Sequence, residues 1–270
     1  MRATLDHMRS MARNDPRQYD ELADQWWRPG GSFEMLHWLA AARAALIPPA
    51  DRPGAVLVDA GCGGGLLAPH VRGYRHVGVD LVGSALAQAA EHGVLAVRAD
   101  VARLPLPDAC ADVVSAGEIL EHVTDLSTVV AEACRVLRPG GTLVLDTLAD
   151  TALSRFVAVT LAERVPRVPR GLHDPALFVN RRRLVALCAR HGVALRLRGI
   201  RPAPLPLVRW LFSRRREVPI VPSRSTAILF QGRGVKASER SERAIRPGRE
   251  GLAERGVRVT GVDSRSEATP

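Results

Sequence analysis

The 270-residue sequence contains a single lysine, few aromatic residues and no apolar run long enough to cross a bilayer. Aromatic residues make up 4% of the chain, which disfavours the aromatic platforms on which RNA bases stack. A membrane-spanning helix needs about 20 consecutive apolar residues. The N-terminus also lacks the continuous apolar stretch of a signal peptide. We therefore expect neither a membrane span nor a secretory leader, and no nucleic-acid partner.

Cysteine is also scarce, and its spacing excludes the common redox and zinc motifs. The four cysteines are Cys62, Cys110, Cys134 and Cys188, and no two of them form a C-x-x-C pair. Each lies in apolar or glycine-rich surroundings. We expect a reduced protein of the cytoplasm.

A glycine-rich turn follows the most apolar strand that the sequence predicts. The strand covers residues 56–60 and carries Asp59 near its end, and the turn begins with Gly61 and Gly63. Glycines at such a turn allow the backbone to approach a nucleotide closely. A dinucleotide loop has the pattern G-x-G-x-x-G, and Leu66 stands at the third glycine. The turn by itself therefore leaves both a nicotinamide and an S-adenosylmethionine cofactor open.

Acidic residues follow the next predicted strands in a regular order. Asp80 ends a strand at 76–80, where a carboxylate can accept both hydroxyls of a ribose. Asp100 with Val101 follows, and a fourth strand that contains Val113 and Val114 precedes Gly117. A further apolar strand is expected near 142–145, after a Pro-Gly-Gly turn.

This ordered series resembles the class I S-adenosylmethionine-dependent methyltransferases. The resemblance implies a Rossmann-like α/β fold, with a seven-stranded, mostly parallel sheet flanked by helices. It implies that Gly61 and Gly63 hold the methionine part of the cofactor beside Asp59, and that Gly117 belongs to the same site. Asp80 would bind the ribose, and Asp100 with Val101 would lie beside the adenine.

Paired tryptophans before the glycine turn narrow the resemblance. Tyr19, Trp26 and Trp27 recur at helical spacing from Asp15, with Asn14 or Asp15 as the cap. This segment, with the later Leu-His pair that includes His37, is similar to the polyprenyl-catechol O-methyltransferases of ubiquinone biosynthesis. The resemblance implies that Trp26, Trp27 and His37 form a lid over the site. One departure is Trp38, because that family usually has an arginine there that touches the cofactor; Arg43 is expected to be structural.

A second motif points to activation of the acceptor oxygen. Glu118, Glu121 and His122 have the spacing i, i+3 and i+4, which places them on one face of a helix. Two carboxylates and one imidazole suit Mg²⁺ or Mn²⁺. The resembling family has the same E-x-x-E-H motif and binds a divalent cation. Without a metal, His122 would act as a general base, and the two glutamates would cap the N-terminus of the helix or keep it in contact with solvent.

The net charge of +10 belongs to one part of the chain. Residues 1–154 carry 13 Arg against 19 Asp and Glu, whereas residues 155–224 carry 16 Arg against 3 acidic residues. Apolar stretches alternate with these arginines. We interpret 151–216 as a surface for an anionic membrane, with a basic amphipathic insertion at 151–180 after the fifth strand. The alternative is a solvated face whose Arg stems cover the edge of the core.

The sequence therefore predicts one catalytic domain at residues 14–232, whose first part, 14–50, is the helical lid. Residues 1–13 are expected to be flexible and 233–270 to be a disordered tail. The expected activity is methylation of a catechol or phenol hydroxyl, on a quinone precursor with an isoprenoid tail, at the inner face of the membrane. A soluble hydroxylated metabolite is the alternative substrate. A nicotinamide oxidoreductase and a non-catalytic lipid-binding protein are the alternatives from other classes.

Overall fold

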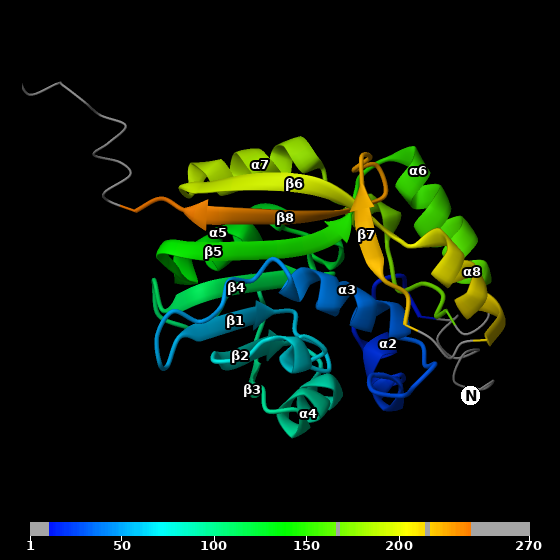
Figure 1. The fold of residues 1–270 in the computed structure, drawn as a ribbon, viewed down its shortest axis with the longest axis horizontal. Helices are drawn as coiled ribbons and strands as arrows, with labels where there is room; N and C mark the ends of the chain where they lie inside the picture. The colour runs from blue at the N-terminus through cyan, green and yellow to red at the C-terminus, as the bar shows by residue number, and fades with distance from the viewer. Residues whose placement is uncertain (1–10, 166–167, 214–216, 239–270) are drawn as a thin grey trace, which may run out of the picture. The chain divides into compact units, whose positions relative to one another are not determined.

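The computed structural model describes residues 11–165, 168–213 and 217–238, and its centre is an eight-stranded sheet (Figure 1). The strand order is β3-β2-β1-β4-β5-β8-β6-β7. The strands are β1 (Val56–Ala60), β2 (Arg75–Asp80), β3 (Leu95–Arg98), β4 (Ala111–Gly117), β5 (Leu137–Leu148), β6 (Val193–Pro202), β7 (Ile220–Ser223) and β8 (Leu229–Lys236). The expected α/β fold is confirmed, with eight strands in place of seven. The short edge strand β7 accounts for the difference.

The sheet has a parallel half and an antiparallel half. β1 pairs in parallel with β2 and β4, and β5 continues the parallel half beyond β4. β8 then runs antiparallel between β5 and β6. Leu57 and Val58 of β1 are fully buried, as expected for a continuous aliphatic strand covered on both faces. Because parallel strands end at the same edge, the residues after β1, β2 and β4 are brought together there.

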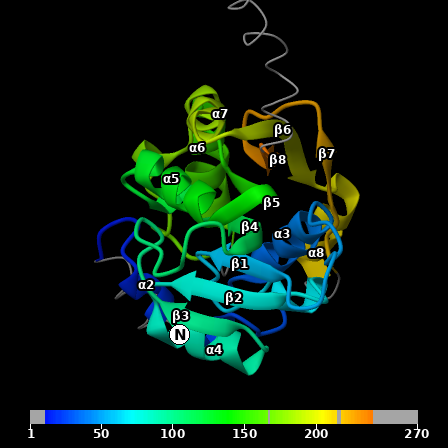
Figure 2. The ribbon, with the colours of Figure 1, turned by 90° about the vertical axis from the view of Figure 1, so that its left-hand side faces the viewer.

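Helices cover both faces of this sheet. Figure 2 shows α5 and α7 on one face and α3 on the other. The helices are α2 (Arg17–Asp20), α3 (Glu34–Ala44), α4 (Gly83–Glu91), α5 (Leu126–Val136), α6 (Ala152–Arg155), α7 (Arg181–Arg190) and α8 (Pro204–Ser213), with shorter turns η1 (Ala23–Gln25), η2 (Ala68–His70), η3 (Leu120–His122), η4 (Phe156–Leu161), η5 (Ala162–Arg164) and η6 (Pro175–Leu177). Among the described residues, none of these helices has the length and apolarity that a membrane span requires.

The main core lies between the sheet and the pair α5 and α7. Val129 and Val130 of α5 pack there with Leu184 of α7. The N-terminus of α5 is capped by Asp125, whose carboxylate accepts the N–H groups of Ser127 and Thr128. Capping and apolar spacing together explain why this segment is helical.

The N-terminal segment is less regular than its spacing predicts. The continuous helix expected from Asp15 is replaced by one turn of α2, a break, and the 3₁₀ turn η1. Asn14 does not cap α2, whereas the Asp15 carboxylate accepts the N–H of Arg17, the first residue of α2, at 3.0 Å, as expected of a cap that precedes Pro16. Asn14 has a φ of 62°, in the left-handed region, and its side chain bonds to a residue outside the N-terminal segment.

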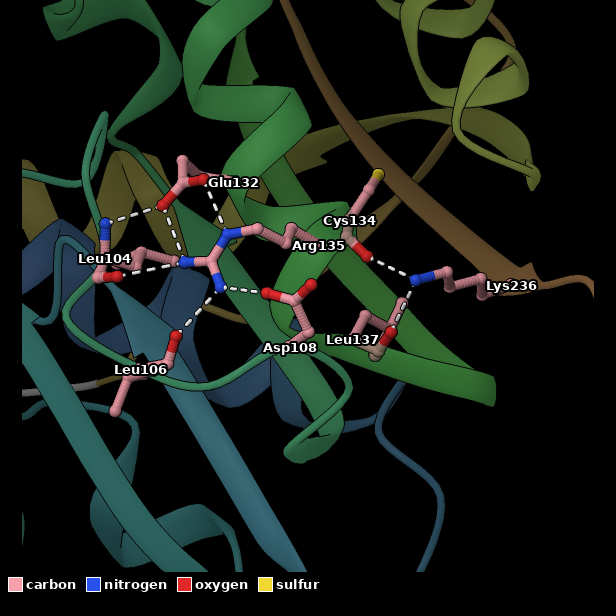
Figure 3. Close-up of polar contacts among 8 residues, drawn as sticks. All are labelled: Leu104, Leu106, Asp108, Glu132, Cys134, Arg135, Leu137 and Lys236. Atoms are coloured by element: carbon pink, nitrogen blue, oxygen red, sulfur yellow. Dashed lines mark hydrogen bonds and ion pairs between the residues drawn. The ribbon is translucent and has the colours of Figure 1, made fainter.

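The compact unit also ends later than expected. β8 continues to Lys236, and the unit extends to Ala237, beyond the boundary expected at 232. The Lys236 ammonium donates to the carbonyl oxygens of Cys134 and Leu137, at 2.7 and 2.8 Å (Figure 3). Residues 233–236 are therefore part of the sheet. The tail at 239–270 and the segment 1–10 lie outside the described residues.

Charged side chains at the edge where the parallel strands begin are well supplied with partners. Arg135 pairs with Glu132 and Asp108 and also donates to the carbonyl oxygens of Leu104 and Leu106 (Figure 3). We call this edge, with Asp112 at the start of β4, the amino edge of the sheet. Its charged groups satisfy one another and the neighbouring main chain.

Candidate functional site

A cavity of about 950 Å³ opens at the carboxyl edge of the parallel strands. This edge is where α/β folds commonly bind their ligands. Ten of the predicted site residues line it: Trp26, Asp59, Gly61, Gly63, Asp80, Asp100, Val101, Gly117, Glu118 and His122. Glu121, Trp27 and His37 do not belong to the lining. The sheet topology has therefore assembled most of the predicted site.

The glycine turn has a backbone that requires glycine. Gly61 and Gly63 have φ of 72° and 51°, in the left-handed region. A Cβ on Gly61 would lie 2.5 Å from Ile119, and one on Gly63 would lie 2.5 Å from the ring of Trp26. The turn therefore packs directly against Trp26 of the N-terminal segment.

Asp80 and Asp100 present carboxylates to the same cavity. Asp80 accepts the N–H groups of Gly63 and Val82, each at 2.9 Å, with different oxygens. Each of these oxygens retains a lone pair. Burial raises the pKa of Asp80, and the two N–H groups offset part of this rise. Asp100 accepts the N–H of Ala102 and is exposed to the cavity.

The N-terminal segment is anchored by the residues that were expected to close the site. Trp27 donates its indole N–H to the carbonyl oxygen of Gly64 at 2.9 Å. Nε2 of His37 lies 2.8 Å from the carbonyl oxygen of Trp26. Trp26 itself faces the cavity and stacks on Phe33, with ring centroids 4.1 Å apart. Trp27 and His37 thus hold Trp26 in place from outside the cavity.

The predicted helix that would carry Glu118, Glu121 and His122 does not form. Glu118 has φ of 51°, outside the helical region, and only the 3₁₀ turn η3 follows it. Helix α5 begins at Leu126. Glu118 and His122 still face the cavity, whereas Glu121 lies fully buried behind its wall and accepts the hydroxyl of Thr147 at 2.7 Å. The prediction of one helical face is wrong, although the three residues remain close.

These side chains have unusual protonation equilibria. Burial, then repulsion by Glu121, raises the pKa of Glu118, and burial also raises the pKa of Glu121. One carboxylate oxygen of each glutamate is buried without a hydrogen-bond partner. Burial lowers the pKa of His122 to about 3, so its imidazole is neutral. A buried pair of unsatisfied carboxyl groups beside a neutral imidazole is a set of groups that a cation would stabilise.

His173 is a site residue that the motif did not include. Ligand atoms of Glu121, His122 and His173 all lie within 4.8 Å of one another, and no other such group occurs among the described residues. The rings of the two histidines are 5.1 Å apart. The geometric set for a metal therefore contains His173 in place of Glu118. Nothing in the local sequence marks His173, which the insertion brings to the site.

Arg43 is also placed at the site, although the sequence suggested only a structural role. It is buried, lines the cavity and pairs with Asp146 at 2.6 Å. A Cβ on Gly117 would lie 1.8 Å from its guanidinium, so Gly117 leaves the space that Arg43 occupies. Its Nε has no hydrogen-bond partner. Arg43 is thus a positive charge in the cavity wall as well as a structural ion pair.

Trp38 has a packing role. It is buried away from the cavity, and its ring meets Trp210 of α8 edge to face at 5.1 Å. The indole N–H of Trp210 donates to Glu34 at 2.9 Å. Trp38, where this chain departs from the family that it resembles, therefore packs α3 against α8.

The basic insertion and α8 border the cavity and expose apolar side chains on their other faces. Val157 and Leu161 of the insertion and Leu207 and Leu211 of α8 line the cavity. The apolar residues with large exposed fractions are Leu153 at 50% and Phe156 at 52% in the insertion, and Leu205 at 71%, Val208 at 51% and Phe212 at 87% in α8. The cavity-lining Leu161 and Leu211 are also exposed, at 45% and 44%. Arg155 and Arg209 are exposed beside them. Arg167 and Arg214–Arg216 lie outside the described residues.

Comparison with known proteins identifies the relatives of this chain. The family described as "Methyltransferase domain" matches residues 58–145. The "Ubiquinone biosynthesis O-methyltransferase" of Burkholderia pseudomallei (strain K96243) is 33% identical over 213 residues, covering 72% of this chain and 90% of that protein. The protein of the same name from Thiobacillus denitrificans is 34% identical over 187 residues, covering 65% of this chain and 81% of that protein.

Solved structures agree on the fold. A SAM-dependent methyltransferase from Thermotoga maritima superposes with a TM-score of 0.58 at 18% identity, covering 82% of this chain and 97% of that one. A SAM-dependent methyltransferase from Aquifex aeolicus gives a TM-score of 0.50 at 13% identity, covering 82% of this chain and 98% of that one. At these identities the likeness concerns the fold.

Proposed function

Because this chain belongs to the family of the ubiquinone biosynthesis O-methyltransferases, and is thus an S-adenosylmethionine-dependent methyltransferase, we propose that it methylates a catechol or phenol hydroxyl on a quinone precursor with an isoprenoid tail. The observation that carries the proposal is the single cavity. It joins the glycine turn, the polar group around His122 and an apolar region between η4 and α8. A donor, a reacting hydroxyl and an apolar tail each find matching surroundings there.

The residues at the glycine turn fit the methyl donor. Asp80 has a free lone pair on each carboxylate oxygen and would accept the ribose hydroxyls. Asp100 and Val101 would lie beside the adenine. Arg43 would face the carboxylate of the methionine part, since its buried charge has an unpartnered Nε. S-adenosylmethionine supplies a methyl group that its sulfonium has already activated.

The remaining polar residues would prepare the acceptor oxygen. Glu121, His122 and His173 would hold a divalent cation, and a cation there would favour the ionised form of a phenolic hydroxyl. Because two imidazoles and one carboxylate suit a transition metal, Mn²⁺ fits this set better than Mg²⁺. Glu118 lines the cavity beside these residues and would accept the hydroxyl proton. The oxygen then bonds to the methyl carbon, while the carbon–sulfur bond breaks and sulfur keeps its electron pair.

Without a cation, His122 would itself be the general base. The two accounts differ in their response to chelation. We expect EDTA to lower turnover strongly, and added Mn²⁺ to restore it. Unchanged turnover with EDTA, together with a large loss in His122→Gln, would leave the general-base account alone.

The reaction is tested by mass spectrometry of prenylated and unprenylated catechols incubated with S-adenosylmethionine. We expect the prenylated catechol to gain the mass of one added CH₂, with a higher kcat/KM than the short catechol. Equal kcat/KM for both would favour the alternative of a soluble hydroxylated metabolite. No methylated product from any catechol would contradict the proposal.

The apolar outer faces of α6, η4 and α8 support a further part of the proposal, which is contact with an anionic membrane surface. Exposed apolar residues beside exposed arginines are typical of interfacial segments. A tail that leaves the cavity between η4 and α8 would meet lipid there. The surface would let the enzyme take its substrate from the bilayer while the polar head reaches His122.

Vesicle binding tests this surface. We expect the protein to sediment with anionic vesicles at low salt and to be released at high salt. Leu205→Ser with Phe212→Ser should weaken binding, whereas Leu81→Ser with Leu95→Ser, which alters exposed leucines near β3, is the matched control. Equal binding by both double variants, or no binding by the wild type, would contradict the membrane proposal.

A further inference from the structure

Asn14 makes two hydrogen bonds to His122, from the N-terminal segment across the cavity wall. Its Nδ2 donates to the main-chain carbonyl oxygen of His122 at 2.9 Å. Its Oδ1 lies 2.5 Å from Nδ1 of the His122 ring. Both residues line the cavity. One side-chain amide thus contacts the backbone and the ring of the same residue.

These two contacts determine where the imidazole carries its hydrogen. Only the NH₂ end of the Asn14 amide can donate to a carbonyl oxygen, so the oxygen end must face the ring. An oxygen can only accept, and Nδ1 must therefore be protonated. In a neutral imidazole the other nitrogen, Nε2, then keeps its lone pair.

The position of Asn14 is itself held by several contacts. Its φ of 62° lies in the left-handed region that asparagine tolerates better than most residues. Its N–H donates to the carbonyl oxygen of Gly171 at 2.9 Å. The neighbouring Arg13 pairs with Glu163 and donates to the carbonyl oxygen of His173. The insertion therefore fastens Asn14 in the orientation that His122 needs.

We propose that Asn14 is a positioning residue that keeps His122 in the Nδ1–H tautomer and presents its unprotonated Nε2 to the cavity. The nearest polar group to Nε2 is the hydroxyl of Tyr19 at 3.4 Å, a long contact that a stronger partner can replace. Partners of the ring nitrogen opposite the reactive one commonly fix histidine in this way. The inference rests on the proposed role of His122, in which Nε2 binds a cation or accepts a proton.

Nitrogen-15 NMR of histidine-labelled protein measures the tautomer without any turnover. The His122 resonances are assigned by their loss in His122→Gln. We expect the Nδ1–H tautomer in the wild type and in Asn14→Asp, whose carboxylate still accepts from Nδ1–H. Asn14→Gly, which suits the left-handed backbone but has no side chain, should shift His122 toward the Nε2–H tautomer.

Asn180→Gly is the matched control, because Asn180 caps α7 through the N–H of Arg183 and does not contact His122. It should leave the tautomer unchanged. An Nε2–H tautomer in the wild type, or the wild-type tautomer in Asn14→Gly, would overturn the inference.

Steady-state kinetics gives the second readout. We expect Asn14→Gly to lower kcat about 10–100-fold and to leave KM for S-adenosylmethionine unchanged. Asn14→Asp should recover most of kcat. An unchanged kcat in Asn14→Gly would also overturn the inference. If the wild type methylated no catechol, the proposed function would fail, while the NMR result would still decide the role of Asn14.

Discussion

Asp112 and Asp80 stand at opposite edges of the same parallel sheet, and their carboxylates have opposite surroundings. Asp112, at the amino edge, accepts the N–H of Val56 at 2.7 Å and is paired with Arg52 and Arg138. Burial alone would raise the pKa of Asp112, but these partners outweigh it and lower that pKa. Asp80, at the carboxyl edge, has a raised pKa because the hydrogen bonds from backbone N–H groups do not offset its burial.

The same contrast extends to their neighbours. At the amino edge Glu132 is paired with Arg135 and its pKa is lowered, first by that hydrogen bond (Figure 3). At the carboxyl edge Glu118 and Glu121 each keep a buried oxygen without a partner. One edge therefore stabilises the fold, and the other retains buried polar groups without a protein partner, which is typical of a binding site.

The largest expected effect is on activity, where substitution at the carboxyl edge should lower kcat and substitution at the amino edge should not. His122→Gln should lower kcat by about 10²–10⁴-fold, because it removes Nε2 from the reacting oxygen. Asp112→Asn should keep kcat within about twofold, since the amino edge lies away from the cavity. Both values come from product formation at saturating S-adenosylmethionine. A comparable loss of kcat in both variants would show that the two edges do not differ in this way.

The next expected effect is on stability, where substitution at the amino edge should matter more than substitution at the carboxyl edge. Asp112→Ala should lower the free energy of unfolding by about 1–2 kcal/mol, because it removes the acceptor of the Val56 N–H and the carboxylate that pairs with Arg52 and Arg138, although Arg138 keeps its contact with Asp51. His122→Gln should change it by less than about 1 kcal/mol. Urea denaturation of both variants at pH 7 is the measurement. The comparison fails if His122→Gln proves the more destabilising of the two.

Addition of a ligand should stabilise the protein through the carboxyl edge. S-adenosylhomocysteine at 100 times its Kd should raise the free energy of unfolding by about 2.7 kcal/mol. Asp80→Asn should lose most of the accompanying rise in Tm. Asp108→Asn, which alters the partner of Arg135 at the amino edge, should keep the rise. Thermal unfolding with and without the ligand checks both, and a full Tm shift in Asp80→Asn would count against Asp80 as the ribose ligand.

The smallest effect is a difference in pH dependence. The pKa of Asp80 is higher in the folded protein than its ordinary value of 3.8. Between these two pKa values the folded protein binds more protons than the unfolded chain, so the contribution of Asp80 to the free energy of unfolding falls as pH rises. Asp112 has a lowered pKa, so its contribution is present above its unfolded pKa and is lost as pH falls through the folded value. A tenfold difference in proton affinity between the folded and unfolded states corresponds to about 1.4 kcal/mol of stability.

Urea unfolding at pH 4 and pH 7 measures these opposite slopes. The free energy of unfolding of Asp80→Asn, relative to that of the wild type, should be higher at pH 7 than at pH 4. Asp112→Asn needs a third measurement at about pH 2.5, because the window of Asp112 lies below its unfolded pKa; the free energy of unfolding of this variant relative to the wild type should be lower at pH 4 than at about pH 2.5. Slopes of the same sign in the two variants would refute the assignment of opposite roles.

Local patterns predicted the parts of the site that depend on neighbours in the sequence. The strand before Gly61 and the acid at the end of β2 were found correctly, because continuous aliphatic residues and glycines constrain a short segment directly. Glu118 was placed on a helix that does not form. Its spacing matched a helical face, but the chain leaves β4 with Glu118 at φ of 51°, a bend that periodicity does not reveal.

The contacts that spacing could not predict join distant segments. His173 comes from the insertion and Asn14 from the N-terminal segment, and both meet His122 after β4. Trp38 and Trp210 belong to α3 and α8. A single side chain carries no record of a partner a hundred residues away, so these pairs appear only when the sheet is assembled.

Sequence alone specified the glycine turn and the acids at the end of β2 and after β3, because these depend on local periodicity or backbone freedom, and the order of these motifs, by its resemblance to a known family, indicated the α/β fold. Tertiary structure decided which polar groups meet around His122 at the cavity. It placed Glu121 behind the cavity wall, brought His173 forward and turned Asn14 onto His122. The physical reason is that burial and pairing depend on segments far apart in the chain, and these set the protonation and orientation of the groups that react.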